Sequence, residues 1–113
     1  MARYGPGHDL ACRLFADAKS ALGVDKFDIA INTVGKVLKK PVSEVTEAEY
    51  DEMFAVNSKI AFFFIQEAAR NLVDGGTIIS IVTSLLGAFA PGYPTYQGSK
   101  APVEWFTKSA AKE

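Results

Sequence analysis

The sequence predicts an α/β fold that contains part of a doubly wound parallel sheet. Two short segments, 27–32 and 77–82, are mostly apolar and have the length of strands. Segments with helical periodicity precede, separate and follow them, so the predicted order is helix, strand, helix, strand, helix. Two strands that are joined through a helix form a parallel pair with a right-handed crossover. Because two parallel strands alone leave both sheet edges open, we interpret residues 1–113 as a single, partial domain.

The first part of the chain predicts a helix and then a buried strand. Apolar residues recur at helical spacing over 9–22, where Asp9 can cap the helix and Gly23 is a typical stop. The Gly-Pro-Gly segment 5–7 ahead of this helix predicts a loop. The apolar run 27–32 suits a strand that is covered on both faces.

The middle of the chain predicts a long amphipathic helix over 47–72. Thr46 and Glu49 have the spacing of a capping box at its start, and the Asp-Gly-Gly segment 74–76 is expected to stop it. A loop then leads to a third helix over 94–113, which begins with a proline, a residue that fits the first turn.

Composition and charge exclude several classes of function. The chain has 113 residues, with 12 Lys plus Arg and 13 Asp plus Glu, so it has no excess of positive charge with which to bind nucleic acid. No apolar run approaches the roughly 20 residues that span a membrane. A single histidine, His8, and a single cysteine, Cys12, predict no metal site and no internal disulfide. We therefore expect a soluble, cytoplasmic protein.

Polar residues gather where the two strands end, which is where open α/β sheets bind ligands. Asn32 and Gly35 follow the first strand, and Ser84 follows the second. Tyr96 and Lys100 are four residues apart, so they share one face of the third helix. A nearby ammonium favours the phenolate form of a tyrosine, which makes a tyrosine hydroxyl useful as a proton donor and acceptor. Taken alone, the pair also fits an exposed helical pair without function.

A further polar residue, Asn57, lies inside the long helix, where an amide forms helix poorly and indicates a local polar role. The motifs of the chain are then, in order, Asn32-Thr33-Val34-Gly35, Asn57 in Val-Asn-Ser-Lys, Ser84 in Thr-Ser-Leu-Leu-Gly, and Tyr96-Gln97-Gly98-Ser99-Lys100. Together they resemble the motifs of the short-chain dehydrogenase/reductase family, whose sheet is Rossmann-like. The resemblance runs from about residue 9 to the end of the chain.

The resemblance implies an oxidoreductase that moves a hydride between a nicotinamide cofactor, NAD or NADP, and a small-molecule alcohol or carbonyl compound. It implies that Tyr96 is the general acid and base, and that Lys100 assists it and binds the nicotinamide ribose. It also implies that Ser84 holds the substrate oxygen and that Asn57 anchors a water in a proton relay. We expect this chain to be an incomplete segment of such an enzyme.

The resemblance also implies further contacts. Asn32 and Gly35 would line the cofactor crevice, together with Tyr96 and Lys100. The family pairs its subunits through the helices that correspond to 47–72 and 94–113, which implies a homo-oligomer.

The sequence departs from the family pattern in three respects. It has no strand followed by a Gly-rich turn for the cofactor pyrophosphate, and therefore no residue that would choose between NAD and NADP. Thr33 and Val34 differ from the usual Asn-Asn-Ala-Gly turn. Ser84 lies one residue closer to Tyr96 than is commonest, so Thr83 is an alternative hydroxyl. A second interpretation therefore stays open, in which the chain is a non-catalytic relative that serves as an oligomerisation or protein-interaction module.

Overall fold

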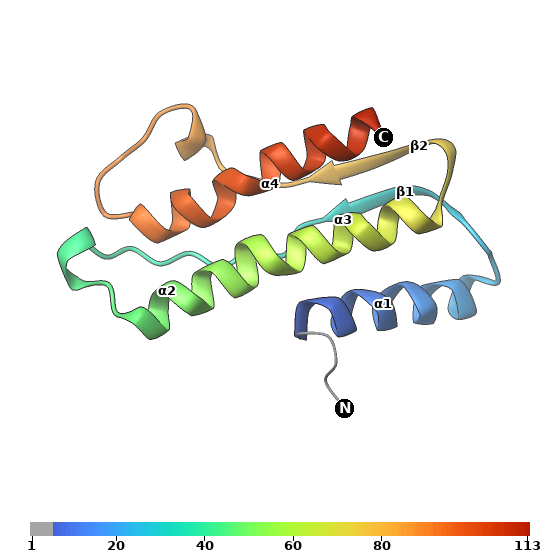
Figure 1. The fold of residues 1–113 in the computed structure, drawn as a ribbon, viewed down its shortest axis with the longest axis horizontal. Coiled ribbons are helices and arrows are strands. Elements are labelled where there is room, and N and C mark those ends of the chain that lie inside the picture. Colours follow the sequence, from blue (N-terminus) through green and yellow to red (C-terminus); the bar gives the residue numbers. More distant parts are fainter. Residues whose placement is uncertain (1–5) are drawn as a thin grey trace.

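The structure, a computed structural model, describes residues 6–113 and has the predicted order of helices and strands (Figure 1). Its elements are α1 (Pro6–Leu22), β1 (Phe27–Asn32), α2 (Glu47–Phe54), α3 (Ile60–Asn71), β2 (Leu72–Ser80) and α4 (Pro94–Lys112). A π-helical turn, Ala55–Lys59, joins α2 to α3, and short 3-10 turns occupy Val42–Glu44 and Ser84–Leu86. Within the described part of the chain, no helix combines the length and the hydropathy that crossing a bilayer requires.

The two strands form a parallel sheet, as their connection through a helix predicts. Pairing is regular over the last four residues of β1, which has the predicted bounds. Both predicted bounds of the second strand, 77–82, are wrong, because β2 begins at Leu72, which pairs with Phe27, and ends at Ser80. An irregularity in pairing follows, and Gly75, with a φ of +80°, adopts a conformation that favours glycine there. The segment 74–76 is therefore part of the strand and not the end of the helix.

The helices α1, α3 and α4 form one layer, which covers a single face of the sheet. Ala30 of β1 is buried in a cluster with Phe15 of α1 and Phe64 of α3, and these two helices lie side by side (Figure 1). The α4 helix reaches the sheet through Thr107, whose Oγ1 donates to Ser80 Oγ at 3.0 Å. Ala30 pairs with Ile78, and Ser80 lies two positions further along β2. Because side chains alternate between the two faces of a strand, Ala30 and Ser80 point to the same face.

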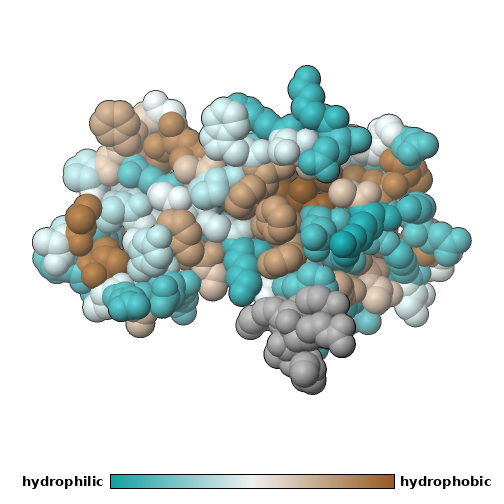
Figure 2. Space-filling view, viewed as in Figure 1, coloured by the Kyte–Doolittle hydropathy of each residue, from teal (hydrophilic) through white to brown (hydrophobic). Residues whose placement is uncertain are grey.

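The opposite face of the sheet carries four isoleucines. Ile29 and Ile31 are 59% and 53% exposed, and Ile79 and Ile81 are 40% and 50% exposed. The prediction that β1 is covered on both faces is therefore wrong for this chain, because the helices of the described residues pack on the other face. Figure 2 shows further apolar side chains gathered over the loop between β2 and α4.

The start of α1 differs from the prediction, and its end agrees with it. The helix begins at Pro6, so Pro6 and Gly7 belong to the first turn and not to a loop, while Gly5 lies outside the described residues. Asp9 lies in the first turn and is not a cap. A proline suits this position because its fixed φ fits a helix and its missing N–H has no partner in a first turn. Gly23 follows the last helical residue with a φ of +66°, which confirms the predicted stop.

The long helix is confirmed with one interruption. Thr46 and Glu49 form the predicted capping box, in which each side chain accepts from the backbone N–H of the other residue. The π-helical turn then separates α2 from α3, and α3 ends at Asn71, one residue before the predicted end of the 47–72 helix. Such turns insert an extra residue and are frequent at functional sites.

Candidate active site

The buried ammonium of Lys100 joins the two loops that follow the strands. Its Nζ donates to Ile81 O at 3.1 Å and to Val34 O at 3.3 Å, and the residue is only 4% exposed. Burial lowers the pKa of Lys100 below its ordinary value. A Cβ at Gly35 would lie 2.7 Å from this Nζ, so the ammonium packs directly on the backbone of Gly35. The structure thus brings the predicted residues Gly35 and Lys100 together at the strand ends.

Asn32 shapes the turn that carries Gly35. Its side chain is buried, and its Oδ1 accepts from Val34 N at 3.1 Å. Its backbone O accepts from Ile81 N, which continues the pairing of the two strands into the loops. Asn32 is therefore a residue that fixes loop geometry beside the Lys100 ammonium.

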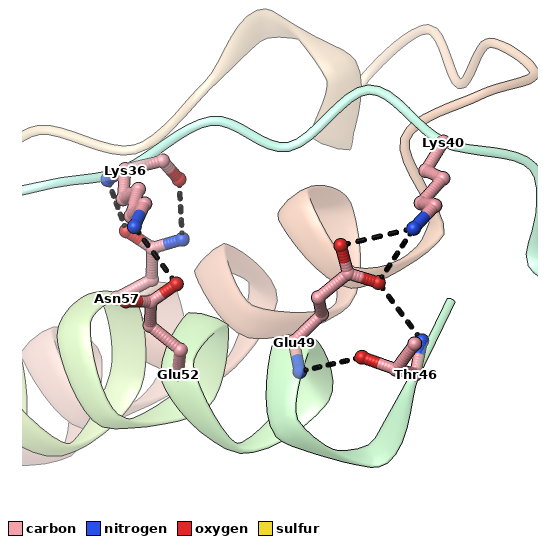
Figure 3. A network of polar contacts seen from close by, with 6 residues as sticks. All are labelled: Lys36, Lys40, Thr46, Glu49, Glu52 and Asn57. Carbon is pink, nitrogen blue, oxygen red and sulfur yellow. Dashed lines mark hydrogen bonds and ion pairs between the residues drawn. The ribbon is translucent and has the colours of Figure 1, made fainter. Parts of the chain in front are cut away.

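Asn57 clamps the loop after β1 onto the helices (Figure 3). Its side chain lies in the π-helical turn and is fully buried. Its Oδ1 accepts from Lys36 N at 2.8 Å, and its Nδ2 donates to Lys36 O at 2.8 Å and to Ser99 Oγ at 2.9 Å. Ser99 is also fully buried and donates to Tyr96 O at 3.2 Å. Both N–H groups of the Asn57 amide are therefore used to hold protein groups together.

Two ion pairs hold the loop that follows β1 against α2 (Figure 3). Lys36 Nζ lies 2.8 Å from Glu52, and Lys40 Nζ lies 3.0 Å from Glu49, the capping-box residue. Lys40 N also donates to Gly92 O at 2.7 Å, which ties this loop to the one before α4. Exposed ion pairs contribute little stability one by one, but together they fix the path of the loop. Sequence reasoning missed these contacts, because charged loop residues are usually solvated.

Tyr96 lies in the first turns of α4, on the face that Lys100 continues. It is half-buried, and its ring lies beside that of Tyr93, with centroids 6.3 Å apart. The Lys100 ammonium bonds to the two backbone carbonyls and not to the Tyr96 hydroxyl. The predicted pair therefore shares one helix face without a direct hydrogen bond.

Two hydroxyls follow β2. Thr83 caps the 3-10 turn, because its Oγ1 accepts from Leu85 N at 3.3 Å. Ser84 is the first residue of that turn and is exposed, whereas Thr83 is half-buried. Of the two hydroxyls that the sequence left open, Ser84 is thus the more accessible.

Comparison with known proteins connects this arrangement to reductases. A family model described as enoyl-(acyl carrier protein) reductase matches residues 9–113. The hydroxynaphthalene reductase-like protein Arp2 of Metarhizium brunneum is 40% identical over 102 residues, which are 88% of this chain and 37% of that protein. A short-chain dehydrogenase/reductase of Pestalotiopsis microspora is 38% identical over 100 residues, with the same coverage. The chain therefore spans about 37% of the length of these curated relatives.

Solved structures show the same similarity in three dimensions. A dehydrogenase structure from Burkholderia cenocepacia with bound NADP aligns with a TM-score of 0.85 and 67% identity, over 90% of this chain and 38% of that one. The landomycin C-6 ketoreductase LanV, with bound NADP and rabelomycin, aligns with a TM-score of 0.80 and 31% identity, over 96% of this chain and 46% of that one. The described helices and strands thus have the arrangement of one segment of these enzymes.

Proposed function

The chain belongs to the short-chain dehydrogenase/reductase family, and on this premise we propose that it is the catalytic segment of an NAD(P)-dependent oxidoreductase. The proposed reaction moves a hydride between the cofactor and the carbon of a small-molecule carbonyl or alcohol. The observation that carries the proposal is the Lys100 ammonium, which is buried between the ends of both strands one turn beyond Tyr96.

The residues present fit the ribose and nicotinamide end of such a cofactor. An ammonium has three N–H donors, and Lys100 uses two of them on backbone carbonyls, which leaves one for a ribose hydroxyl. Gly35 exposes backbone beside that ammonium, and a Cβ there would fill the space next to Nζ. Residues 1–113 contain no Gly-rich turn after a strand, so we propose a single partial domain that contacts only this end of the cofactor. When bound, the nicotinamide ring supplies or accepts the hydride.

The proton in this reaction is assigned to Tyr96. In the direction of reduction, its hydroxyl gives a proton to the substrate oxygen, and in the direction of oxidation it takes the proton back. Lys100, one turn of helix away, is proposed to assist this proton transfer through its positive charge. Ser84 donates a hydrogen bond to the substrate oxygen, which holds it within reach of Tyr96.

Asn57 is proposed to act on the proton path through its backbone and not through its side-chain N–H groups. Both of those groups are bonded to Lys36 and Ser99. π-Helical turns are frequent at functional sites, and a backbone carbonyl oxygen has a second lone pair with which it can accept from a water. We therefore propose that a water relay at Asn57 starts from its backbone carbonyl oxygen. The hydrogen bonds of the Asn57 side chain to Lys36 and Ser99 hold this part of the backbone in place.

The test replaces the matching segment of the Burkholderia cenocepacia protein by residues 9–113 of this chain, since the two are 67% identical. The chimera is titrated with NADPH and NADH and assayed with both against a panel of ketones. We expect Tyr96→Phe to lower kcat by about 10² to 10⁴ and to leave the Kd of the cofactor within about twofold. Tyr93→Phe is the matched control, because it removes a neighbouring hydroxyl outside the proposed chemistry.

Two results would overturn the proposal. A Tyr96→Phe chimera that turns over at the wild-type rate would remove Tyr96 from the chemistry. A folded chimera that binds neither cofactor would favour the non-catalytic interpretation.

Self-association is proposed for the outer faces of α3 and α4, with a second copy of this chain as the partner. Phe62 is 41% exposed and Trp105 is 67% exposed, and the two helices line a groove of about 470 Å³ between them. We expect Trp105→Asp to shift a dimer or larger assembly towards monomer in sedimentation. Phe89→Asp, which changes a side chain that is 89% exposed in the loop between β2 and α4, should leave the assembly intact. A monomeric wild-type chain would refute this interface.

A further inference from the structure

Three metal-ligating side chains meet between α1 and α3, and none of them belongs to the candidate active site. His8 and Cys12 lie on α1, and Glu67 lies on α3. One ligand atom from each residue can be chosen so that all three lie within 4.8 Å of one another. The sequence predicted no metal site because it has a single histidine. The fold supplies the third ligand from a helix that is more than 50 residues away along the chain.

The two helices hold these side chains in place. His8 and Cys12 are four residues apart and therefore lie one above the other on the face of α1. The His8 ring packs edge-on against Phe63 of α3, with centroids 5.3 Å apart. Close packing of α1 on α3 begins at Gly7, where a Cβ would lie 3.4 Å from Phe63 Cδ2. Glu67 is only 9% exposed, so its carboxylate is buried against α1.

The distances are close to those of a tetrahedral zinc site. Zinc bonds of 2.0–2.3 Å in tetrahedral geometry place the ligand atoms about 3.3–3.8 Å apart. Cys12 Sγ lies 3.6 Å from His8 Nδ1 and 3.8 Å from His8 Nε2, which is already within that range. All of the chosen ligand atoms lie within 4.8 Å of one another, about 1 Å beyond that range. Binding would have to close this gap of about 1 Å, which is within the reach of side-chain rotation.

The ligand types select the class of metal. Imidazole nitrogen, thiolate sulfur and carboxylate oxygen are the three donors that zinc takes in proteins. Calcium and magnesium take oxygen ligands, and a thiolate disfavours them.

We propose that His8, Cys12 and Glu67 bind one divalent ion of the zinc class, with a water as fourth ligand, and that this ion fastens α1 to α3. On binding, the Cys12 thiol loses its proton to solvent as the metal–sulfur bond forms. Glu67 exchanges its ion pair with Arg70, at 2.9 Å, for the metal. Losing this ion pair costs little free energy, because the Arg70 side chain is 60% exposed and stays hydrated.

The test is a titration of the purified chain with Co²⁺, followed by displacement with Zn²⁺. We expect one equivalent of Co²⁺ to give a sulfur-to-metal charge-transfer band in the near ultraviolet and the visible bands of a tetrahedral ion. Cys12→Ser should abolish the charge-transfer band, and Glu67→Gln and His8→Gln should each weaken binding about tenfold or more. Asp9→Asn is the matched control, because it removes an exposed carboxylate next to His8 that pairs with Arg13.

A second measurement uses the wild-type chain and does not depend on the folding of any variant. Zn²⁺ should slow the alkylation of Cys12 by iodoacetamide about tenfold or more. At 100 times its Kd, Zn²⁺ should also raise the melting temperature by roughly 10 °C. The proposal is overturned by the absence of a charge-transfer band in the wild type, by its persistence in Cys12→Ser, by its loss in Asp9→Asn, or by unchanged alkylation.

Discussion

Replacing Asn57 by alanine tests whether one buried amide organises the candidate active site. The substitution removes three hydrogen bonds, two with the backbone of Lys36 and one with Ser99 Oγ, at a position with no exposed surface. Lys36 is exposed, so water can replace its two bonds at a modest cost, whereas the Ser99 hydroxyl is buried and loses a donor outright. With the small cavity that remains, we expect the free energy of unfolding to fall by about 2–4 kcal/mol.

The assay is urea unfolding followed by circular dichroism, with Asn71→Ala as the matched control. Asn71 is also a buried asparagine of the long helix, but its side chain makes a single hydrogen bond, from Nδ2 to Glu67 O. We expect that control to cost about 1 kcal/mol plus a similar cavity contribution. A double-mutant cycle with Ser99→Ala should give a coupling energy of about 1 kcal/mol. The reasoning is refuted if Asn57→Ala costs no more than Asn71→Ala, or if the coupling to Ser99 is zero.

Three further predictions concern the strand ends and the sheet. Gly35→Ala should displace the Lys100 ammonium, because the new Cβ would lie 2.7 Å from Nζ, and NMR of ¹³C-methylated lysines should show a shift that Gly87→Ala does not produce. Burial lowers the pKa of Lys100 in the folded state, so the unfolded chain binds more protons and wild-type stability rises as the pH increases through that lowered pKa. Lys100→Met should flatten this alkaline rise in urea unfolding, and an equally steep profile in the variant would contradict the assignment. Ile31→Thr on the open face of the sheet should change the free energy of unfolding by less than about 0.5 kcal/mol and reduce light scattering, whereas Phe64→Ala in the core should cost about 3–5 kcal/mol. Similar costs for the two would show that the faces are misassigned.

Local patterns predicted most of the elements and some of their ends. The bounds of β1 agree with the prediction because its short apolar run is set off from the α1 helix by Gly23 and ends in a polar turn. The capping box formed as predicted because Thr46 and Glu49 need only each other's backbone. Each of these features depends on residues within a few positions of one another, which a sequence pattern records directly.

The errors occurred where packing overrides local preference. The Gly-Gly pair after Asp74 is typical of a helix stop, yet α3 had already ended at Asn71 because Leu72 pairs with Phe27. The Ile residues of β1 predicted two covered faces, but all the described helices pack on the side of Ala30. Neither the pairing partner nor the side on which a helix packs is recorded in the local sequence.

The candidate active site also has some features that short-range sequence patterns predict and others that only packing decides. The sequence by itself determined which residues stand at the strand ends and on one face of α4, because strand direction and helical period follow from short-range patterns. Only the tertiary structure decided the partners of the buried polar groups. Lys100 bonds to carbonyls 66 and 19 residues before it, and Asn57 bonds to Lys36 and Ser99. In the same way, Glu67 comes to lie beside His8 and Cys12. The physical reason is that a buried polar group must find a partner. In this chain those partners lie on elements far apart in sequence, which come together only when the helices and the sheet pack.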